Sequence, residues 1–296
     1  MKKVAIVTDG SCDLPKDLIE KYGIHIAPFQ VIIESKAYQL YGDSGDITKE
    51  EFYHKLATNT EMPTTGVPSP KSFHDAFEKA LKDAKSVIAI FLSKELSGTI
   101  QSALRVVKMF ENADITIVDS KVSASCLGLL ALQAAKMADK GASKEDILQE
   151  LDKLIPQTRL VVVMDTMEYL FKGGRIGRAK KFFGSALNIK PILHFENGVV
   201  TPGGTLRGRA EVIKRMKFMA KFVVKNAITD TIFIWHTRDL ETATEIYDIM
   251  IKSNGNGKEI RIQEAGPVIG THTGPKSLGF TYIGNYNKDW LLKMKE

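Results

Sequence analysis

The fold class is indicated by the first stretch of the chain, which passes from a strand through a loop into a helix: Lys3-Val-Ala-Ile-Val-Thr-Asp-Gly-Ser-Cys-Asp-Leu-Pro15. Residues 3–7 are a short apolar run, which is typical of a buried strand. Residues 8–13 are mostly small and polar, so we expect a loop there. Pro15 opens a helix that closes before Gly23, since proline favours the first helical position and glycine the position after the last.

This order of elements repeats through the first half of the chain. Further strands are predicted at residues 24–33, 86–92 and 114–118. Helices are predicted to start at Ser69-Pro70, Thr99, Ser123 and Ser143. Strands that alternate with helices of this length indicate a mostly parallel sheet flanked by helices on both faces.

The second half follows a different order. Glu196-Asn-Gly198 lies between two short apolar runs, which is a strong signal for a β-hairpin. Strands at 231–235 and 260–264 alternate with helices at 208–227 and 240–252. We therefore expect two α/β domains, residues 1–157 and residues 158–296, with the mostly parallel sheet in the first.

Composition excludes several classes of protein. The chain has 296 residues, is 44% hydrophobic and 26% charged, and carries a net charge of +6, which is a soluble globular balance. No zinc-finger, RNA-recognition or basic-zipper pattern is present, so we expect no nucleic-acid partner. Cys12 and Cys126 fit no metal or disulfide spacing, and the chain start is not a secretory signal, so we expect a cytoplasmic protein without a metal.

Polar loops follow the predicted strands, where open parallel sheets bind their ligands. Ser97, Gly98 and Thr99 precede a helix, whose unpaired N–H groups and partial positive charge suit the oxygens of an anion. Plain capping of that helix by a hydroxyl is an equally good explanation. Thr64 and Thr65 also supply hydroxyls, although this pair alone fits a structural cap better than a binding site.

Two further segments carry polar groups beside glycine. Gly266-Pro-Val-Ile-Gly-Thr-His-Thr-Gly-Pro275 is predicted to be a rigid, non-helical loop in which Thr271, His272 and Thr273 suit a carboxylate or phosphate. A tight surface turn with a solvated histidine is the alternative. Arg175, in Lys172-Gly-Gly-Arg-Ile-Gly-Arg178, has the fork that binds such anions bidentately. A local excess of positive charge surrounds it: Lys172, Arg175, Arg178, Lys180, Lys181 and Lys190.

Catalytic patterns are weak by comparison. The chain has no Gly-x-Ser-x-Gly nucleophile elbow, no His-Glu-x-x-His and no pair of histidines at metal-binding spacing. The sequence therefore selects no catalytic residue.

Seven motifs occur in the order of one known family, over about residues 4–284. They are Thr8-Asp, Thr64-Thr65-x-x-Pro-Ser-Pro70, Leu96-Ser-Gly-Thr-x-Gln-Ser-Ala103, Asp119-Ser120, Leu170-x-Lys-Gly-Gly-Arg-Ile176, Asn188-Ile-Lys-Pro-Ile-Leu193 and Gly266–Pro275. This set resembles the DegV family of bacterial fatty-acid-binding proteins that serve a fatty acid kinase. Gly10-Ser11, Ile100 and Lys276-Ser277 depart from the usual pattern of the family.

The resemblance implies a long-chain fatty acid, such as palmitate, stearate or oleate, held between two α/β domains without another cofactor. It implies that the carboxylate is bound by Thr65, Ser97, His272 and Arg175. The implied supporting residues are Thr64, Gly98, Thr99, Thr271 and Thr273. Arg207 and Arg209 resemble the segment that meets the kinase.

These features lead to the hypothesis of a monomeric carrier rather than a catalyst. It would withdraw a fatty acid during transient contact with a membrane, present the carboxylate to the kinase and carry the acyl phosphate. An enzyme, either a transferase or a hydrolase acting on a small phosphorylated substrate, is the alternative, because loops that suit an anion serve both functions.

Overall fold

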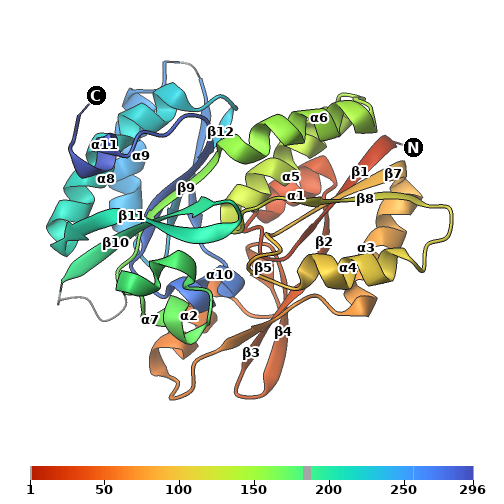
Figure 1. Cartoon of the computed structure of the whole chain (residues 1–296), viewed down its shortest axis with the longest axis horizontal. Coiled ribbons are helices and arrows are strands. Elements are labelled where there is room, and N and C mark those ends of the chain that lie inside the picture. Colours follow the sequence, from red (N-terminus) through yellow and green to blue (C-terminus); the bar gives the residue numbers. More distant parts are fainter. Residues whose placement is uncertain (1, 183–187, 256, 296) are drawn as a thin grey trace. The chain divides into compact units, whose positions relative to one another are not determined.

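The computed structural model describes residues 2–182, 188–255 and 257–295 (Figure 1). The chain forms two compact units. Unit 1 comprises Met1–Pro156 and Gly266–Thr271, and unit 2 comprises Gln157–Ala265 and His272–Glu296. Each unit combines helices with a sheet, so both are α/β, as the sequence predicts.

Unit 1 is built on a four-stranded sheet whose strands are all parallel. Its order is β2 (His25–Ala27), β1 (Lys2–Asp9), β7 (Ala84–Phe91) and β8 (Asp114–Asp119). β1 and β7 pair from Lys2 opposite Ala84 to Thr8 opposite Ile90, so the loops after both strands lie at the same edge. The predicted parallel sheet is therefore confirmed.

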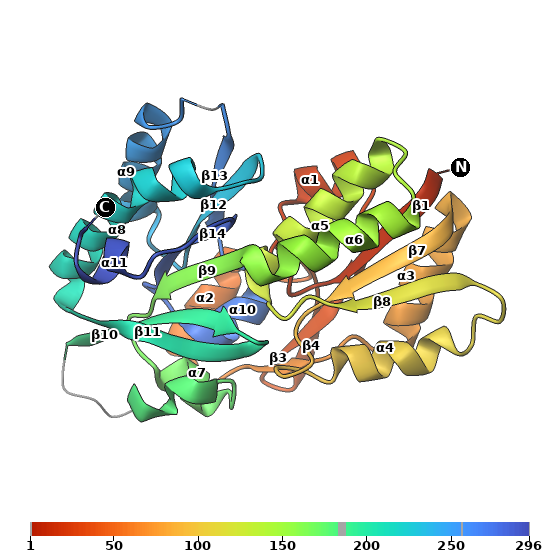
Figure 2. The same cartoon turned by 45° about the horizontal axis from the view of Figure 1, so that its top comes forward.

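Helices cover both faces of this sheet (Figure 2). α1 (Lys16–Tyr22), α5 (Ala124–Asp139) and α6 (Lys144–Leu154) lie on one face, and α3 (Pro70–Asp83) and α4 (Thr99–Val107) on the other. α3 shows why these helices form. Ser69 Oγ accepts a hydrogen bond from the backbone N–H of Ser72, and Pro70 stands at the start. Its buried face then packs on the sheet through Phe73 and Phe77.

A second, antiparallel sheet in unit 1 was not predicted. It has the order β5 (Ser44–Gly45), β4 (Lys36–Tyr41), β3 (Phe29–Ile33) and β6 (Thr64–Gly66), and α2 (Lys49–Thr58) follows β5. The single strand predicted at residues 24–33 is wrong: Pro28 separates β2 from β3, which belong to different sheets. The predicted loop at Thr64 and Thr65 is also wrong, because both residues lie in β6.

Unit 2 contains a six-stranded mixed sheet. Its order is β11 (Val199–Arg207), β10 (Ile189–Glu196), β9 (Thr158–Val163), β14 (Leu278–Ile283), β12 (Thr231–His236) and β13 (Glu259–Glu264). The predicted hairpin is confirmed as β10 and β11, whereas β14 was not predicted. The other elements of unit 2 are α7 (Glu168–Lys172), α8 (Gly208–Asn226), α9 (Leu240–Lys252), α11 (Asp289–Leu292) and the 3₁₀ segment Gly177–Phe182. Another 3₁₀ segment, Ile155–Gln157, includes the last residues of unit 1 before Gln157.

Contrary to the prediction of a non-helical loop, Pro267–Thr273 forms the helix α10. The proline stands at the first position, where its missing N–H is harmless, and Gly274 follows the helix with φ +65°. Gly270 serves packing rather than flexibility. A β carbon on it would lie 2.7 Å from the Phe52 ring and 2.8 Å from the Tyr53 hydroxyl. Glycine and proline thus shape a short, closely packed helix here.

Candidate functional site

The loop that carries Ser97 connects β7 to α4. Ser97 Oγ lies 2.8 Å from Thr99 Oγ1 and accepts a hydrogen bond from the Thr99 backbone N–H at 3.3 Å. Gly98 is exposed, and no atom lies within 4 Å of the position that a β carbon would take. Ser97 Oγ thus binds the first N–H group of α4, but the N-cap residue is Gly98 and has no side-chain cap hydrogen bond, so the plain capping alternative is wrong.

Thr64 and Thr65 lie in β6, which pairs with β3 through Val31 opposite Thr65. Neighbouring side chains of a strand point to opposite faces. In agreement, Thr64 is exposed and Thr65 is half-buried. Of the two hydroxyls, that of Thr65 is therefore the one held in a defined, partly desolvated place. Like Ser97, it belongs to unit 1.

Arg175 follows the end of α7 in unit 2. The chain leaves this helix through a Schellman-type turn: Gly173 N–H donates to Tyr169 O, Arg175 N–H donates to Leu170 O, and Gly174 has φ +70°. The exposed Arg175 side chain donates through Nη1 to the Gly173 carbonyl at 3.0 Å. The two glycines before Arg175 thus fix the turn that places its guanidinium.

His272, in the last turn of α10, lies against the same turn of unit 2. A β carbon on Gly173 would be only 2.4 Å from His272 Nδ1, so glycine is needed for this approach. Burial, and then the positive charge of Arg175, lower the pKa of His272 from 6.5 to about 4. The imidazole is therefore neutral at pH 7 and has one N–H to donate. Of the predicted carboxylate-binding residues, the structure brings His272 and Arg175 together.

The threonines on either side of His272 have structural contacts. Thr271 is buried, and its hydroxyl donates to the Pro267 carbonyl at 2.9 Å within α10. Thr273 is half-buried, and its carbonyl accepts from Ser277 Oγ at 3.5 Å. The next residue, Gly274, touches the Tyr169 ring so closely that a β carbon would lie 2.1 Å from it. α7 and the end of α10 are therefore closely packed in unit 2.

Three of the six cations in the predicted basic cluster have acidic partners. Three ion pairs join these side chains within unit 2: Lys172 to Glu168 at 2.5 Å, Arg178 to Glu196 at 2.9 Å, and Lys190 to Asp165 at 2.6 Å. Lys180 is exposed, and the side chain of Lys181 lies outside the described residues. These pairs reduce the positive charge that the cluster offers to a phosphate.

The two arginines of the predicted kinase-contacting segment differ in their surroundings. Arg207 is exposed, and its backbone N–H donates to Glu211 at 2.7 Å. Arg209 is half-buried, forms an ion pair with Asp239 and donates to the Lys276 carbonyl at 3.0 Å. Burial lowers the pKa of Arg209. Arg209 therefore has a structural role at the start of α8, whereas Arg207 presents its charge to solvent.

Two buried carboxylates in unit 1 were not predicted as site residues. Asp9 and Asp13 are both completely buried in the loop after β1. Burial raises the pKa of Asp9 from 3.8 to about 6, although hydrogen bonds from Ser11 and Leu92 oppose the shift. Both carboxylates accept hydrogen bonds from backbone groups far away in the sequence, so the Thr8-Asp motif and the polar loop at residues 8–13 do not reveal these partners.

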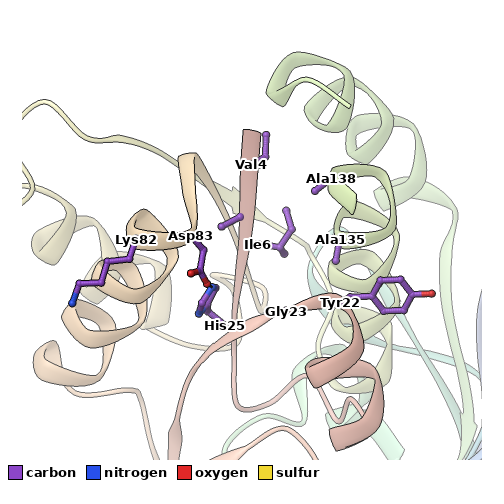
Figure 3. Close-up of a pocket in the computed structure, with 10 residues that line it drawn as sticks. Val4, Ile6, Tyr22, Gly23, His25, Lys82, Asp83, Ala135 and Ala138 are labelled. Atoms are coloured by element: carbon purple, nitrogen blue, oxygen red, sulfur yellow. The ribbon is translucent and has the colours of Figure 1, made fainter. Parts of the chain in front are cut away.

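Two cavities of unit 1 contain none of the predicted site residues. One, of about 480 Å³, is lined by β1 residues such as Val4 and Ile6 and by Ala135 and Ala138 of α5 (Figure 3). His25 and Asp83 point toward each other at its side, 3.1 Å apart. The other, of about 700 Å³, lies between α1, α3 and the antiparallel sheet. Neither coincides with the residues that suit a carboxylate.

Among residues 2–182, 188–255 and 257–295, no three His, Cys, Asp or Glu side chains are grouped in a way that would hold a metal ion. None of the helices in the described part of the chain combines the length and apolar character needed to cross a membrane.

Comparisons with known proteins place these observations in a family. A DegV domain-containing protein of Caldanaerobacter subterraneus is 39% identical over 279 residues, which cover 94% of this chain and 98% of the relative. A solved structure described as fatty acid binding of a DegV family protein from Thermus thermophilus has a TM-score of 0.84 and 31% identity. It covers 96% of this chain and 100% of its own.

A stearic acid-binding protein from Eubacterium ventriosum has a TM-score of 0.79 at 26% identity, covering 96% of this chain and 98% of its own. The family model described as an uncharacterised protein of the DegV family matches residues 3–285. The match spans both units, and the solved relatives cover nearly the same length. The chain belongs to the DegV family.

Proposed function

We propose that this protein binds one long-chain fatty acid and that Thr65, Ser97, Arg175 and His272 bind its carboxylate. The observation that carries the proposal is the close approach of the neutral His272 imidazole to the glycine-shaped turn that carries the Arg175 guanidinium. The fatty-acid binding named for relatives that match almost the whole chain supports the choice of ligand.

The chemistry of these groups suits a carboxylate. Arg175 supplies the positive charge, and neutral His272 donates one hydrogen bond without repelling that arginine. The hydroxyls of Ser97 and Thr65 add donors that carry no charge. Affinity would come from the tail, since burying methylene groups contributes about 0.8 kcal/mol each, or roughly 11 kcal/mol for a palmitoyl chain before the costs of binding. The polar groups would orient the head.

Calorimetric titration of the delipidated protein with palmitate tests this proposal. We expect one palmitate per chain, and about tenfold weaker binding for Ser97→Ala, Arg175→Gln or His272→Ala, because each removes a hydrogen bond to a charged group. Lys180→Gln is the matched control, since it removes an exposed cation from the Arg175 segment. A wild-type protein that fails to bind palmitate or oleate would contradict the proposal, as would three variants with unchanged affinity.

We further propose that the bound fatty acid is presented to an ATP-dependent kinase in the cytoplasm. A carboxylate oxygen would bond to the γ-phosphorus of ATP, the bond from that phosphorus to the bridging oxygen would break, and ADP would leave. The protein would then carry the acyl phosphate, and it would load fatty acid during transient contact with a membrane. The exposed charge of Arg207 supports a contact with the kinase in this segment better than the engaged side chain of Arg209 does.

An assay of acyl phosphate formation separates this role from the enzyme alternative. We expect product only when the kinase, ATP and the loaded protein are all present. Arg207→Glu would lower the yield without changing palmitate affinity, because the side chain is exposed. ATP hydrolysis or acyl phosphate formation by this chain alone would instead favour a transferase or hydrolase.

A further inference from the structure

The loop after β1, residues 9–13, contacts three separate segments of unit 1. Asp9 stands at the carboxyl end of β1 and is completely buried. Its Oδ2 accepts a hydrogen bond from the backbone N–H of Leu92 at 2.9 Å. Its Oδ1 accepts from the N–H and the hydroxyl of Ser11, at 3.0 and 2.5 Å. Leu92 is the first residue after β7, so Asp9 fixes the start of the loop that leads to Ser97.

The Ser97 loop is then fixed at further points. Ser93 N–H donates to the Val122 carbonyl at 2.8 Å, and Ser93 Oγ accepts from the Glu95 N–H at 3.2 Å. Leu96 N–H donates to the Ser93 carbonyl at 3.0 Å. The position set at Leu92 is therefore passed along a short, hydrogen-bonded path to Ser97.

Gly10 connects the same loop to the antiparallel sheet that contains Thr65. Its N–H donates to the Ala27 carbonyl at 3.0 Å. A β carbon would lie 2.0 Å from the Leu40 carbonyl oxygen and 2.7 Å from the Phe29 backbone nitrogen. Phe29 belongs to β3, the strand that pairs with β6 at Thr65. No side chain fits between the loop and this sheet.

Asp13 makes the third contact, at the start of α10. This buried residue has φ +50°, and its Oδ1 accepts from the Gly266 N–H at 2.9 Å. The Gly266 carbonyl in turn accepts from the Gly270 N–H at 2.8 Å in the first turn of the helix. Asp13 thus holds the beginning of the helix whose last turn includes His272.

We propose that Asp9 and Asp13 are positioning residues for carboxylate binding, which hold the Ser97 loop and α10 through their backbone N–H groups. The inference rests on the proposed function. Neither aspartate needs to touch the fatty acid, because each acts on the backbone of a segment that carries a proposed ligand-binding side chain. The Ser97 loop and the start of α10 are distant in sequence, but both are hydrogen-bonded to the five-residue segment 9–13.

The chemistry of Asp9 explains why a carboxylate is needed there. Both of its oxygens face hydrogen-bond donors, and an ionised carboxylate accepts at both. Asparagine has the same shape but accepts at one oxygen only, so its NH₂ group would face a donor. Loss of one such buried hydrogen bond is expected to displace Leu92 or Ser11.

The test compares Asp9→Asn with Asp119→Asn, and Asp13→Ala with Asp119→Ala, because asparagine at position 13 would keep an oxygen that can accept from the Gly266 N–H. Asp119 stands at the end of the neighbouring strand β8, and its Oδ1 accepts from the Lys121 N–H within its own loop at 3.0 Å. We expect about tenfold weaker palmitate binding by the folded Asp9→Asn and Asp13→Ala proteins, and unchanged binding by the two controls. Shifts of the amide NMR signals of Ser97 and Thr99 in Asp9→Asn would show displacement of the loop itself.

Folded Asp9→Asn and Asp13→Ala proteins with wild-type affinity would overturn the proposal. If the wild type binds no fatty acid, the proposed function fails. The amide signals then decide the positioning role alone, and unchanged Ser97 and Thr99 signals would refute it. If Asp9→Asn does not fold, Ser11→Ala removes one donor from Asp9 and should weaken palmitate binding about threefold; wild-type affinity in that variant would also overturn the proposal.

Discussion

Replacing Gly173 by alanine tests the contact that places His272. At Gly173 the backbone has φ −75° and ψ −7°, which alanine adopts without strain, so the cost of the substitution is steric. The new β carbon would lie 2.4 Å from His272 Nδ1, whereas ordinary contacts are about 3.5 Å, so the imidazole must move by about 1 Å. Overpacking of this kind costs about 1–3 kcal/mol of stability.

The displacement should also weaken fatty-acid binding. A shift of about 1 Å breaks a hydrogen bond between His272 and a carboxylate, which corresponds to about a tenfold loss of affinity. Gly174→Ala is the matched control. Nothing lies within 4 Å of its β-carbon position, but φ is +70°, so it should cost about 1 kcal/mol of stability and leave the affinity within about twofold.

Chemical denaturation and palmitate titration of four proteins complete the test: wild type, Gly173→Ala, His272→Ala and the double variant. In the His272→Ala background, Gly173→Ala should cost less than half as much, because the remaining tight contact is the Tyr169 carbonyl at 3.0 Å. The coupling would thus exceed about 0.5 kcal/mol. Losses of stability and affinity that simply add in the double variant would show that Gly173 does not act through His272. A Gly173→Ala protein with wild-type stability and affinity would contradict the prediction as well.

Three further predictions concern stability. Gly10→Ala should destabilise the protein by about 3 kcal/mol or prevent folding, because its β carbon would lie 2.0 Å from the Leu40 carbonyl oxygen. In the control Gly98→Ala, the free energy of unfolding measured in urea should change by under about 0.5 kcal/mol. Burial raises the pKa of Asp9 to about 6, so the free energy of unfolding of the wild type relative to Asp9→Asn should fall by up to about 3 kcal/mol as pH rises from about 4 to 6. A difference in unfolding free energy that does not change with pH would contradict this prediction. Burial lowers the pKa of His272 to about 4, so the free energy of unfolding of the wild type relative to His272→Ala should fall by up to about 3 kcal/mol as pH falls from 6.5 to 4. Unfolding free energies of the two proteins that change in parallel with pH would contradict this prediction.

Most of the parallel sheet of unit 1 was predictable because β1, β7 and β8 are each followed by a helix, whereas β2 is followed by another strand, β3. The antiparallel sheet was not, because its first hairpin turns at Glu34 and Ser35, both with positive φ. Turns of this kind are usually recognised in a sequence by Asn-Gly or Asp-Gly, and neither pair occurs here. β14 is buried along its whole length and therefore lacks the alternation that marks a half-buried strand.

The side chains of the candidate site were proposed from the sequence, whereas the contacts that support them could not be. Glycine next to Arg175 and His272 suggested a binding loop, whereas the structure shows that Gly173 is needed for contact with His272. The Thr8-Asp motif and the polar residues 8–13 marked this loop in the sequence, but not the hydrogen-bond partners of Asp9 and Asp13. Their backbone partners stand 83 and 253 residues away, and an N–H group is the same in every residue except proline.

Fatty-acid binding is tested most simply by mass spectrometry of the small molecules that are released when the purified protein is denatured. We predict one fatty acid of about 14–18 carbons per chain, and its loss from a Ser97→Ala, His272→Ala double variant that still folds. A protein that releases no fatty acid and also takes up neither palmitate nor oleate after purification would contradict the central claim.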